Sequence, residues 1–199
     1  MEIRRFDPET HDVTKVAELI VSAQTDADPD PRSSRGMVID LIMAGNNFLG
    51  HENILVSCSG NEITGLAIGY KGSGKDELLT LLRLLVSLRL SEFASYLTLT
   101  ARLLHGNFTP DIGDDEFYIS ALAVDEIHRR KGIGSLLLDR SLERAKNQSC
   151  RNVVLEVEGG NGPAIGLYRK FGFRFTERSA PDSVRTHAPR SLIMELELP

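Results

Sequence analysis

A basic loop between two predicted secondary-structure elements is the part of this 199-residue sequence best suited to bind an anion. The run Tyr118 to Ser135 is YISALAVDEIHRRKGIGS, in which an apolar, strand-like stretch leads into three consecutive cations and then a helical pattern. The first N–H groups of a helix lack intrahelical partners, and the helix dipole adds positive charge there. Glycine lets a phosphate approach such groups closely. The loop therefore predicts a phosphate-binding site.

Groups that could move protons follow further along the chain. The β-branched run Arg151 to Glu158 ends at the break Gly159 to Pro163, and a short helix carrying Tyr168 comes next. In a strand, Glu156 and Glu158 share one face. A carboxylate can accept a proton and a phenol can donate one, which are the two requirements of acid–base catalysis.

Two motifs resemble those of the GNAT N-acetyltransferase superfamily. The spacing Arg129-x-x-Gly132-x-Gly134 is similar to its (Arg/Gln)-x-x-Gly-x-(Gly/Ala) motif. The second signature, an Asn followed by Ala, Leu-Tyr and Gly-Phe, is matched by Asn161, Ala164, Tyr168, Gly172 and Phe173. The resemblance is close over residues 116–178, and it is closest to the ribosomal-protein alanine N-acetyltransferase-like branch, in which a Glu matching Glu156 is the proposed base.

The resemblance implies acetyl-CoA as co-substrate and a primary amine as acceptor, carried by a small molecule or by the N-terminus or a lysine of a peptide or protein. The loop Arg129 to Ser135 would hold the pyrophosphate, and backbone groups around Leu122 to Val124 would pair with the pantetheine arm and stabilise the oxyanion. The residues that it implies for cofactor binding are Leu122, Ala123, Val124, Arg129, Arg130, Lys131, Gly132, Ile133, Gly134, Ser135, Asn161 and Tyr168.

The resemblance also implies catalytic roles, in direct attack of the amine within a ternary complex. Tyr168 would protonate the departing CoA thiolate, unless its ring only packs against the sheet. We rank Glu156 first as base and Glu116 second, and the alternative for Glu156 is a solvated strand carboxylate. Tyr118 stands where the histone acetyltransferases of the superfamily carry Glu, which disfavours a histone-like lysine mechanism.

The implied fold class is α/β (α+β), the GNAT fold. It is a mixed, mostly antiparallel twisted sheet of about six or seven strands with helices on both faces. Hydrophobic periodicity predicts a loop over residues 26–34 and helices over 14–24, 37–43 and 133–147 and after Pro163. The predicted strands are 3–6, 54–57, 63–70, 117–124, 153–158, 173–177 and 192–198.

The chain is predicted to form one domain over residues 1–199, with a cofactor-binding and catalytic core at 116–178. Residues 76–105 are predicted to form an enlarged helical segment, and the alternatives for its role are to cover the acceptor pocket, to bury a homodimer face or to pack on its own core.

Two other function classes remain as alternatives. A CoA-binding regulatory module would keep the fold without catalysis. The run Gly69 to Asp76 fits a nucleotide-binding P-loop except at its last position, where Asp76 replaces the hydroxyl that binds Mg²⁺. We interpret that run as a glycine turn with Asp76 as a helix N-cap.

Composition argues against several classes. The net charge of −5 disfavours nucleic acid and membrane surfaces as partners. Five scattered histidines and two cysteines give no metal-ligand spacing, so no metal is expected. Charged residues interrupt the leucine-rich stretch 78–104, and the N-terminus has no signal-peptide pattern, so we expect a cytoplasmic protein.

Overall fold

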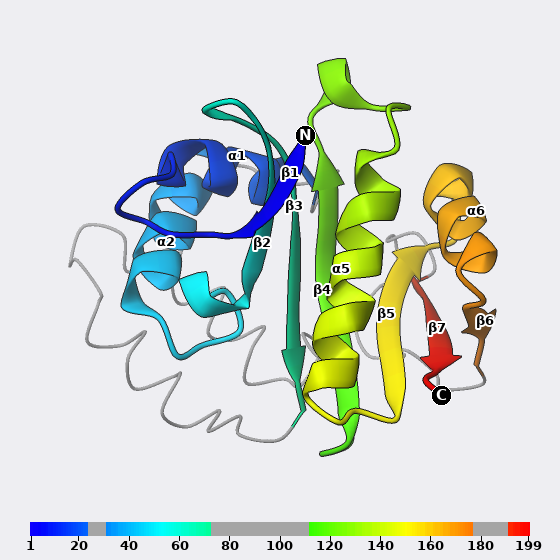
Figure 1. The fold of residues 1–199 in the computed structure, drawn as a ribbon. Helices are drawn as coiled ribbons and strands as arrows, with labels where there is room; N and C mark the ends of the chain where they lie inside the picture. The colour runs from blue at the N-terminus through cyan, green and yellow to red at the C-terminus, as the bar shows by residue number, and fades with distance from the viewer. Residues whose placement is uncertain (24–30, 73–111, 177–190) are drawn as a thin grey trace.

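The computed structural model describes residues 1–23, 31–72, 112–176 and 191–199. Within them the chain forms one seven-stranded sheet in the order β1-β2-β3-β4-β5-β7-β6 (Figure 1). Every neighbouring pair is antiparallel except β4 and β5, which are parallel. The strands are β1 (Glu2–Arg5), β2 (Ile54–Ser59), β3 (Glu62–Lys71), β4 (Glu116–Val124), β5 (Asn152–Glu158), β6 (Arg174–Phe175) and β7 (Ser191–Glu197).

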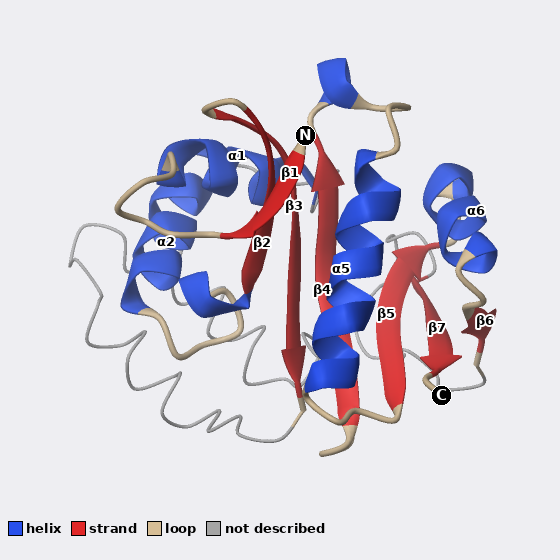
Figure 2. Ribbon diagram, in the orientation of Figure 1, coloured by secondary structure: helices blue, strands red, loops and turns tan. Residues whose placement is uncertain are grey.

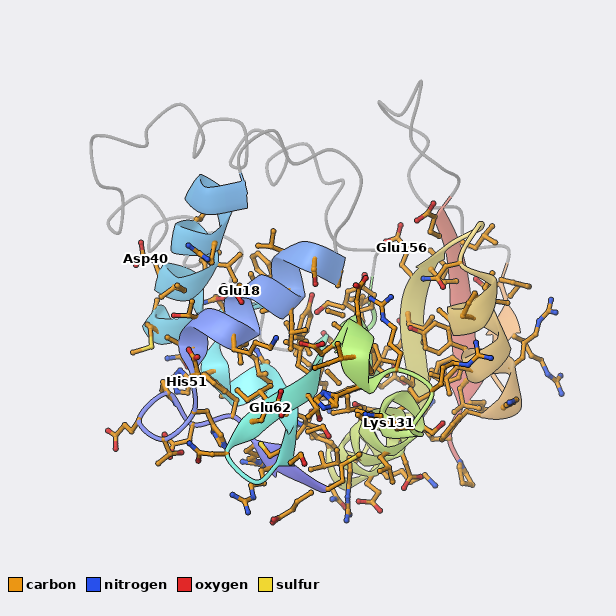
Figure 3. The ribbon with its side chains drawn as sticks, turned by 90° about the horizontal axis from the view of Figure 1, so that it is seen from above. Glu18, Asp40, His51, Glu62, Lys131 and Glu156 are labelled. Atoms are coloured by element: carbon orange, nitrogen blue, oxygen red, sulfur yellow. The ribbon has the colours of Figure 1, made fainter. Side chains whose placement is uncertain are left out.

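Helices cover both faces of this sheet (Figure 2). On one face lie α1 (Val13–Ala23) and α2 (Pro31–Ala44), and on the other lies α5 (Ile133–Asn147), with α6 (Gly162–Lys170) beside it. Seen from above, α1 and α5 are on opposite sides of the strands (Figure 3). Two single-turn helices, η1 (His51–Asn53) and η3 (Glu126–His128), connect elements at the sheet ends.

The two faces bury separate hydrophobic cores. One core joins α1 and α2 to the first strands and includes Val16, Ile20 and Ile42. The other joins α5 and α6 to β4 and β5 and includes Leu138 and Tyr168. This division follows from strand alternation, because successive side chains of a strand point to opposite faces.

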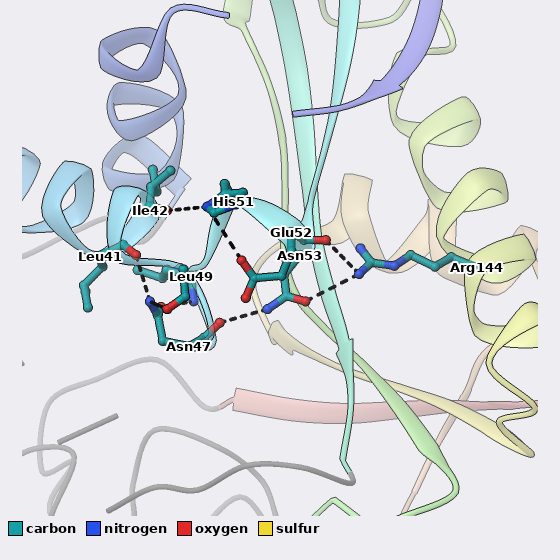
Figure 4. Close-up of polar contacts among 9 residues, drawn as sticks. Leu41, Ile42, Asn47, Leu49, His51, Glu52, Asn53 and Arg144 are labelled. Carbon is teal, nitrogen blue, oxygen red and sulfur yellow. Dashed lines mark hydrogen bonds and ion pairs between the residues drawn. The ribbon is translucent and has the colours of Figure 1, made fainter. Parts of the chain in front are cut away.

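A set of polar contacts fastens the end of α2 to the sheet and to α5 (Figure 4). The buried amide of Asn47 donates to the Leu41 carbonyl and accepts from the Leu49 N–H. Just before the start of β2, the Glu52 carbonyl accepts a hydrogen bond from the Arg144 guanidinium of α5 at 2.9 Å. Burial lowers the pKa of Arg144. These contacts hold α2 and the start of β2 against the C-terminal end of α5, which is the end far from the basic loop.

Most predicted elements are confirmed, and the helix 133–147 matches α5 at both ends. The predicted loop over residues 26–34 is wrong at its end, because α2 already begins at Pro31. Proline suits the first position of a helix, where its missing N–H has no partner to lose. The strand predicted over 173–177 is shorter, since β6 spans only Arg174–Phe175.

The helical segment predicted over 76–105 lies outside the described residues. Of the P-loop-like run, Gly69 to Lys71 belong to β3, where Gly69 pairs with Ile119. A Cβ at Gly69 would come within 2.5 Å of the Phe117 ring, which gives that glycine a packing role.

Candidate active site

The parallel strands β4 and β5 pair only over their first halves. The last pair is Ile119 with Leu155, and beyond it β4 continues against β3 while β5 continues against β7. No described strand pairs with the second edge of β4 from Ser120 to Val124. An extended ligand could therefore add to that edge through backbone hydrogen bonds.

A β-bulge lies where the two strands separate. Ile68 pairs with Ala121 and Gly69 pairs with Ile119, so Ser120 is the extra residue of β4. The bulge changes which residues face each core. Ile119 belongs to the core under α5 and α6, whereas Ala121 packs against the core under α1 and α2. Bulges often occur next to active sites, where they re-aim side chains and end strand pairing.

The basic loop places helix α5 at the open end of this separation. Gly132 is the N-cap of α5 in the left-handed conformation (φ 83°), and no side chain caps the first N–H groups. Arg130 is also left-handed (φ 65°), and Arg129 donates from Nε to the Val124 carbonyl at 3.2 Å. Figure 3 shows Lys131 at this end of the molecule. Exposed cations and uncapped N–H groups together suit a phosphate.

The structure gives the two loop glycines different roles. A Cβ at Gly132 would meet open space, but its positive φ favours glycine. A Cβ at Gly134 would lie 3.3 Å from Leu167 Cδ2, so this glycine permits the close approach of α5 and α6. A substitution at Gly134 would disturb that packing and is a poor test of phosphate binding.

Tyr168 reaches the strands from the α5 and α6 side of the sheet. Its ring lies 5.9 Å from the Phe173 ring, in the same core cluster as Ile119 and Leu155, the last β4–β5 pair. Burial raises the pKa of Tyr168 to about 12. The phenol is therefore protonated at neutral pH, as a proton donor must be, and no described residue forms a hydrogen bond with its hydroxyl.

Glu156 is the first β5 residue beyond the last β4–β5 pair, and it lies on the opposite face from Tyr168. It is half-buried and pairs with Ile193 of β7. Figure 3 shows it on the α1 side of the sheet. Burial and, to a smaller extent, the charge of Glu156 raise the pKa of the neighbouring Tyr118. The Tyr118 ring is buried against the Tyr70 ring at 5.7 Å.

Glu116 lies at the start of β4, at the opposite end of the strand from the basic loop. It is opposite Asn152 at the start of β5 and three residues before Ile119, the last β4 residue that pairs with β5. Its buried carboxylate accepts a hydrogen bond from the Gly113 N–H at 2.8 Å. This hydrogen bond gives Glu116 a structural role, and its catalytic role stays a prediction.

The predicted binding residue Asn161 has a local role as well. It is the N-cap of α6, and its side-chain oxygen accepts a hydrogen bond from the Ala164 N–H at 3.1 Å. The amide nitrogen and the second lone pair of the side-chain oxygen are left for a ligand. Asn before a Gly-Pro pair is typical of a helix start, so the N-cap role of Asn161 was predictable from the sequence.

Sequence reasoning missed the Ser120 bulge and an ion pair between Lys15 of α1 and Asp125 of the loop after β4. Neither leaves a local pattern, because both depend on the partner strand or helix. The described residues contain no group of His, Cys, Asp or Glu that could hold a metal ion. No helix among them is long and apolar enough to cross a membrane.

The acetyltransferase (GNAT) family model matches residues 18–173, more than half of the chain. The chain belongs to the GNAT family. GNAT relatives match over short segments. N-alpha-acetyltransferase 30 of Xenopus laevis is 45% identical over 56 residues, 28% of this chain and 20% of that protein. Mycothiol acetyltransferase of Corynebacterium aurimucosum is 37% identical over 73 residues, 37% of this chain and 23% of that protein.

Two solved structures share the fold over 98–100% of this chain. An N-acetyltransferase from Staphylococcus aureus Mu50 has a TM-score of 0.70 at 22% identity, covering 98% of this chain and 100% of that one. Ribosomal-protein-alanine N-acetyltransferase from Brucella melitensis has a TM-score of 0.60 at 15% identity, with both chains fully covered. By contrast, the chain spans only 20–23% of the length of the two curated relatives named above.

Proposed function

We propose that this GNAT chain transfers the acetyl group of acetyl-CoA to a primary amine. The observation that carries the proposal is the separation of β4 from β5, which has the uncapped N-terminus of α5 at its open end. Tyr168 and Glu156 flank the separation from opposite faces of the sheet. Family membership supports the same reaction.

In this proposal the cofactor lies along the free edge of β4. Its pyrophosphate accepts hydrogen bonds from the N–H groups of Ile133 to Ser135, and Arg130 and Lys131 supply charge. Its pantetheine arm pairs with the backbone of Leu122 to Val124 as an added strand would. The thioester then reaches the point where β4 and β5 separate.

The reaction needs one base, one oxyanion donor and one acid. The neutral amine attacks the thioester carbon, and Glu156 takes the amine proton, directly or through water. A β4 backbone N–H stabilises the oxyanion while the C–N bond forms. As the C–S bond breaks, Tyr168 protonates the thiolate, and it is re-protonated from solvent before the next turnover. Glu116 has no part in this scheme.

The acceptor class that we favour is a protein N-terminal α-amine. An α-amine has a pKa of about 7.7–8.0 against about 10.4 for lysine, so far more of it is neutral at cytoplasmic pH. The names of several matched relatives, N-alpha-acetyltransferases, support this choice. The motif around Glu156 further suggests the ribosomal-protein alanine branch. A small-molecule amine is the second candidate, supported by the mycothiol acetyltransferase match.

An acceptor screen tests the proposal. N-terminal peptides, polyamines, amino acids and amino sugars are each incubated with acetyl-CoA, and the acetylated product is detected by mass spectrometry. We expect peptides with free α-amines to react and their N-blocked forms not to react. Binding of acetyl-CoA without transfer to any acceptor would instead favour a CoA-binding regulatory module.

The proposal places the protein in the cytoplasm. Its two cysteines, Cys58 and Cys150, are both buried and free, as in a reducing compartment. Homodimer formation is an expectation attached to residues 76–105, and size-exclusion chromatography with light scattering tests it.

A further inference from the structure

Ser120 has a buried hydroxyl for which the described part of the chain provides no partner. Its Oγ is inaccessible to solvent and forms no hydrogen bond with any described residue. By contrast, the buried Ser141 hydroxyl donates to the Leu137 carbonyl at 2.8 Å. A buried polar group without a partner is destabilising, so such groups are rare and call for an explanation.

The position of Ser120 indicates where its partner comes from. It is the bulged residue of β4 and directly follows Ile119, the last β4 residue that pairs with β5. A ligand that enters at the α5 N-terminus and follows Val124 and Leu122 inward meets Ser120 at its far end. In acetyl-CoA the far end is the acyl thioester, whose carbonyl oxygen is a hydrogen-bond acceptor.

We propose that the Ser120 hydroxyl donates a hydrogen bond to the carbonyl oxygen of the acyl thioester and so positions it for attack. This inference rests on the proposed function. Ser120 becomes a substrate-contacting residue additional to Tyr168, Glu156 and the backbone N–H donor. Free CoA has no carbonyl oxygen at this position. The Ser120 hydroxyl therefore also allows the protein to bind acetyl-CoA more tightly than free CoA.

The test compares cofactor binding by the wild type and by Ser120→Ala, using isothermal titration calorimetry. Three ligands are titrated: acetyl-CoA, CoA and S-ethyl-CoA, a thioether of the same length that lacks the carbonyl. Ser120→Ala should weaken acetyl-CoA binding about fivefold to tenfold, up to about 1.4 kcal/mol, and leave the other two unchanged. Ser120→Cys, with a weaker donor, should fall between the two proteins.

Ser141→Ala is the matched control, because it removes a buried serine hydroxyl that already has a partner. It should lower the melting temperature and leave the ratio of acetyl-CoA to CoA affinity unchanged. Ser120→Ala should not lower the melting temperature of the free protein, since no protein hydrogen bond is lost.

Equal weakening of all three ligands by Ser120→Ala would overturn the inference, because the hydroxyl would then serve the CoA moiety or the bulge itself. Unchanged binding of all three would overturn it as well. A wild-type protein that binds neither CoA nor acetyl-CoA would refute the proposed function instead, so the two failures are distinguishable.

Discussion

At the scale of single residues, the proposed acid and base differ in what surrounds them. Tyr168 is enclosed by apolar side chains, whereas Glu156 is half-buried beside Tyr118 on the other face of the sheet. Apolar burial keeps a phenol protonated, and a half-exposed carboxylate can exchange protons with water. The environments therefore match the roles proposed for the two groups.

Tyr168→Phe removes the proposed proton donor and keeps the ring. We expect kcat to fall about 10²-fold, while acetyl-CoA affinity and the melting temperature stay nearly constant. Because burial raises the pKa of Tyr168 to about 12, the wild-type rate should not decline between about pH 8 and pH 10 through loss of this proton. Steady-state kinetics over pH checks both expectations, and full activity of Tyr168→Phe would make the residue structural.

Glu156→Gln removes the proposed base, and Glu158→Gln is its control on the same strand face. We expect the first variant to lose about 10²-fold in kcat near neutral pH, with part of the loss recovered at high pH, where the amine is already neutral. The control should keep most of its activity. If both variants behaved alike, the proton would leave through another group.

At the scale of elements, we expect positive charge near the N-terminus of α5 to strengthen CoA binding. Lys131→Glu reverses an exposed charge beside the uncapped helix N-terminus and should weaken CoA binding about tenfold or more. Lys146→Glu makes the same change of net charge at the other end of α5 and should have little effect. The CoA dissociation constants of both variants are measured at two salt concentrations. A similar loss of CoA affinity in both variants would indicate a general effect of net charge and contradict a specific role of the α5 N-terminus.

The ion pair between Lys15 and Asp125 ties α1 to the loop that leads into the phosphate site. The Lys15 ammonium lowers the pKa of Asp125, so the carboxylate's contribution is present above the ordinary pKa of about 3.9 and is lost as pH falls through the lowered value. Lys15→Met should cost about 0.5–1 kcal/mol of unfolding free energy near pH 7, since the pair is partly exposed. Urea unfolding should show this difference vanish near about pH 2, and a difference that persisted there would assign it to packing.

At the scale of the whole molecule, local patterns predicted most of the fold. Alternation and helical spacing located β4, α5 and β5, because each is long and buries one regular face. The start of α2 was missed because Pro31 lies in an acidic, proline-containing stretch that resembles a loop. The mixed, mostly antiparallel character of the sheet was implied only by the family resemblance, and the strand order was not predicted, since pairing depends on residues distant in sequence.

The candidate site was predictable to the extent that it is made of contiguous motifs. The basic loop and Tyr168 are such motifs, and the structure brings both to the separation between β4 and β5. Glu116 was ranked second as base from the sequence, and the structure places it at the start of the nine-residue strand β4, three residues before Ile119. The Ser120 bulge depends on the register of β3, which no single segment encodes.

A crystal structure with acetyl-CoA bound tests most directly whether the separation between β4 and β5 is the transfer site. We predict the pyrophosphate on the N–H groups of Ile133 to Ser135, the pantetheine arm along Leu122 to Val124, and the thioester between Tyr168 and Glu156. Cofactor bound elsewhere, for example at Gly69 to Asp76, with the free edge of β4 left empty, would contradict this assignment.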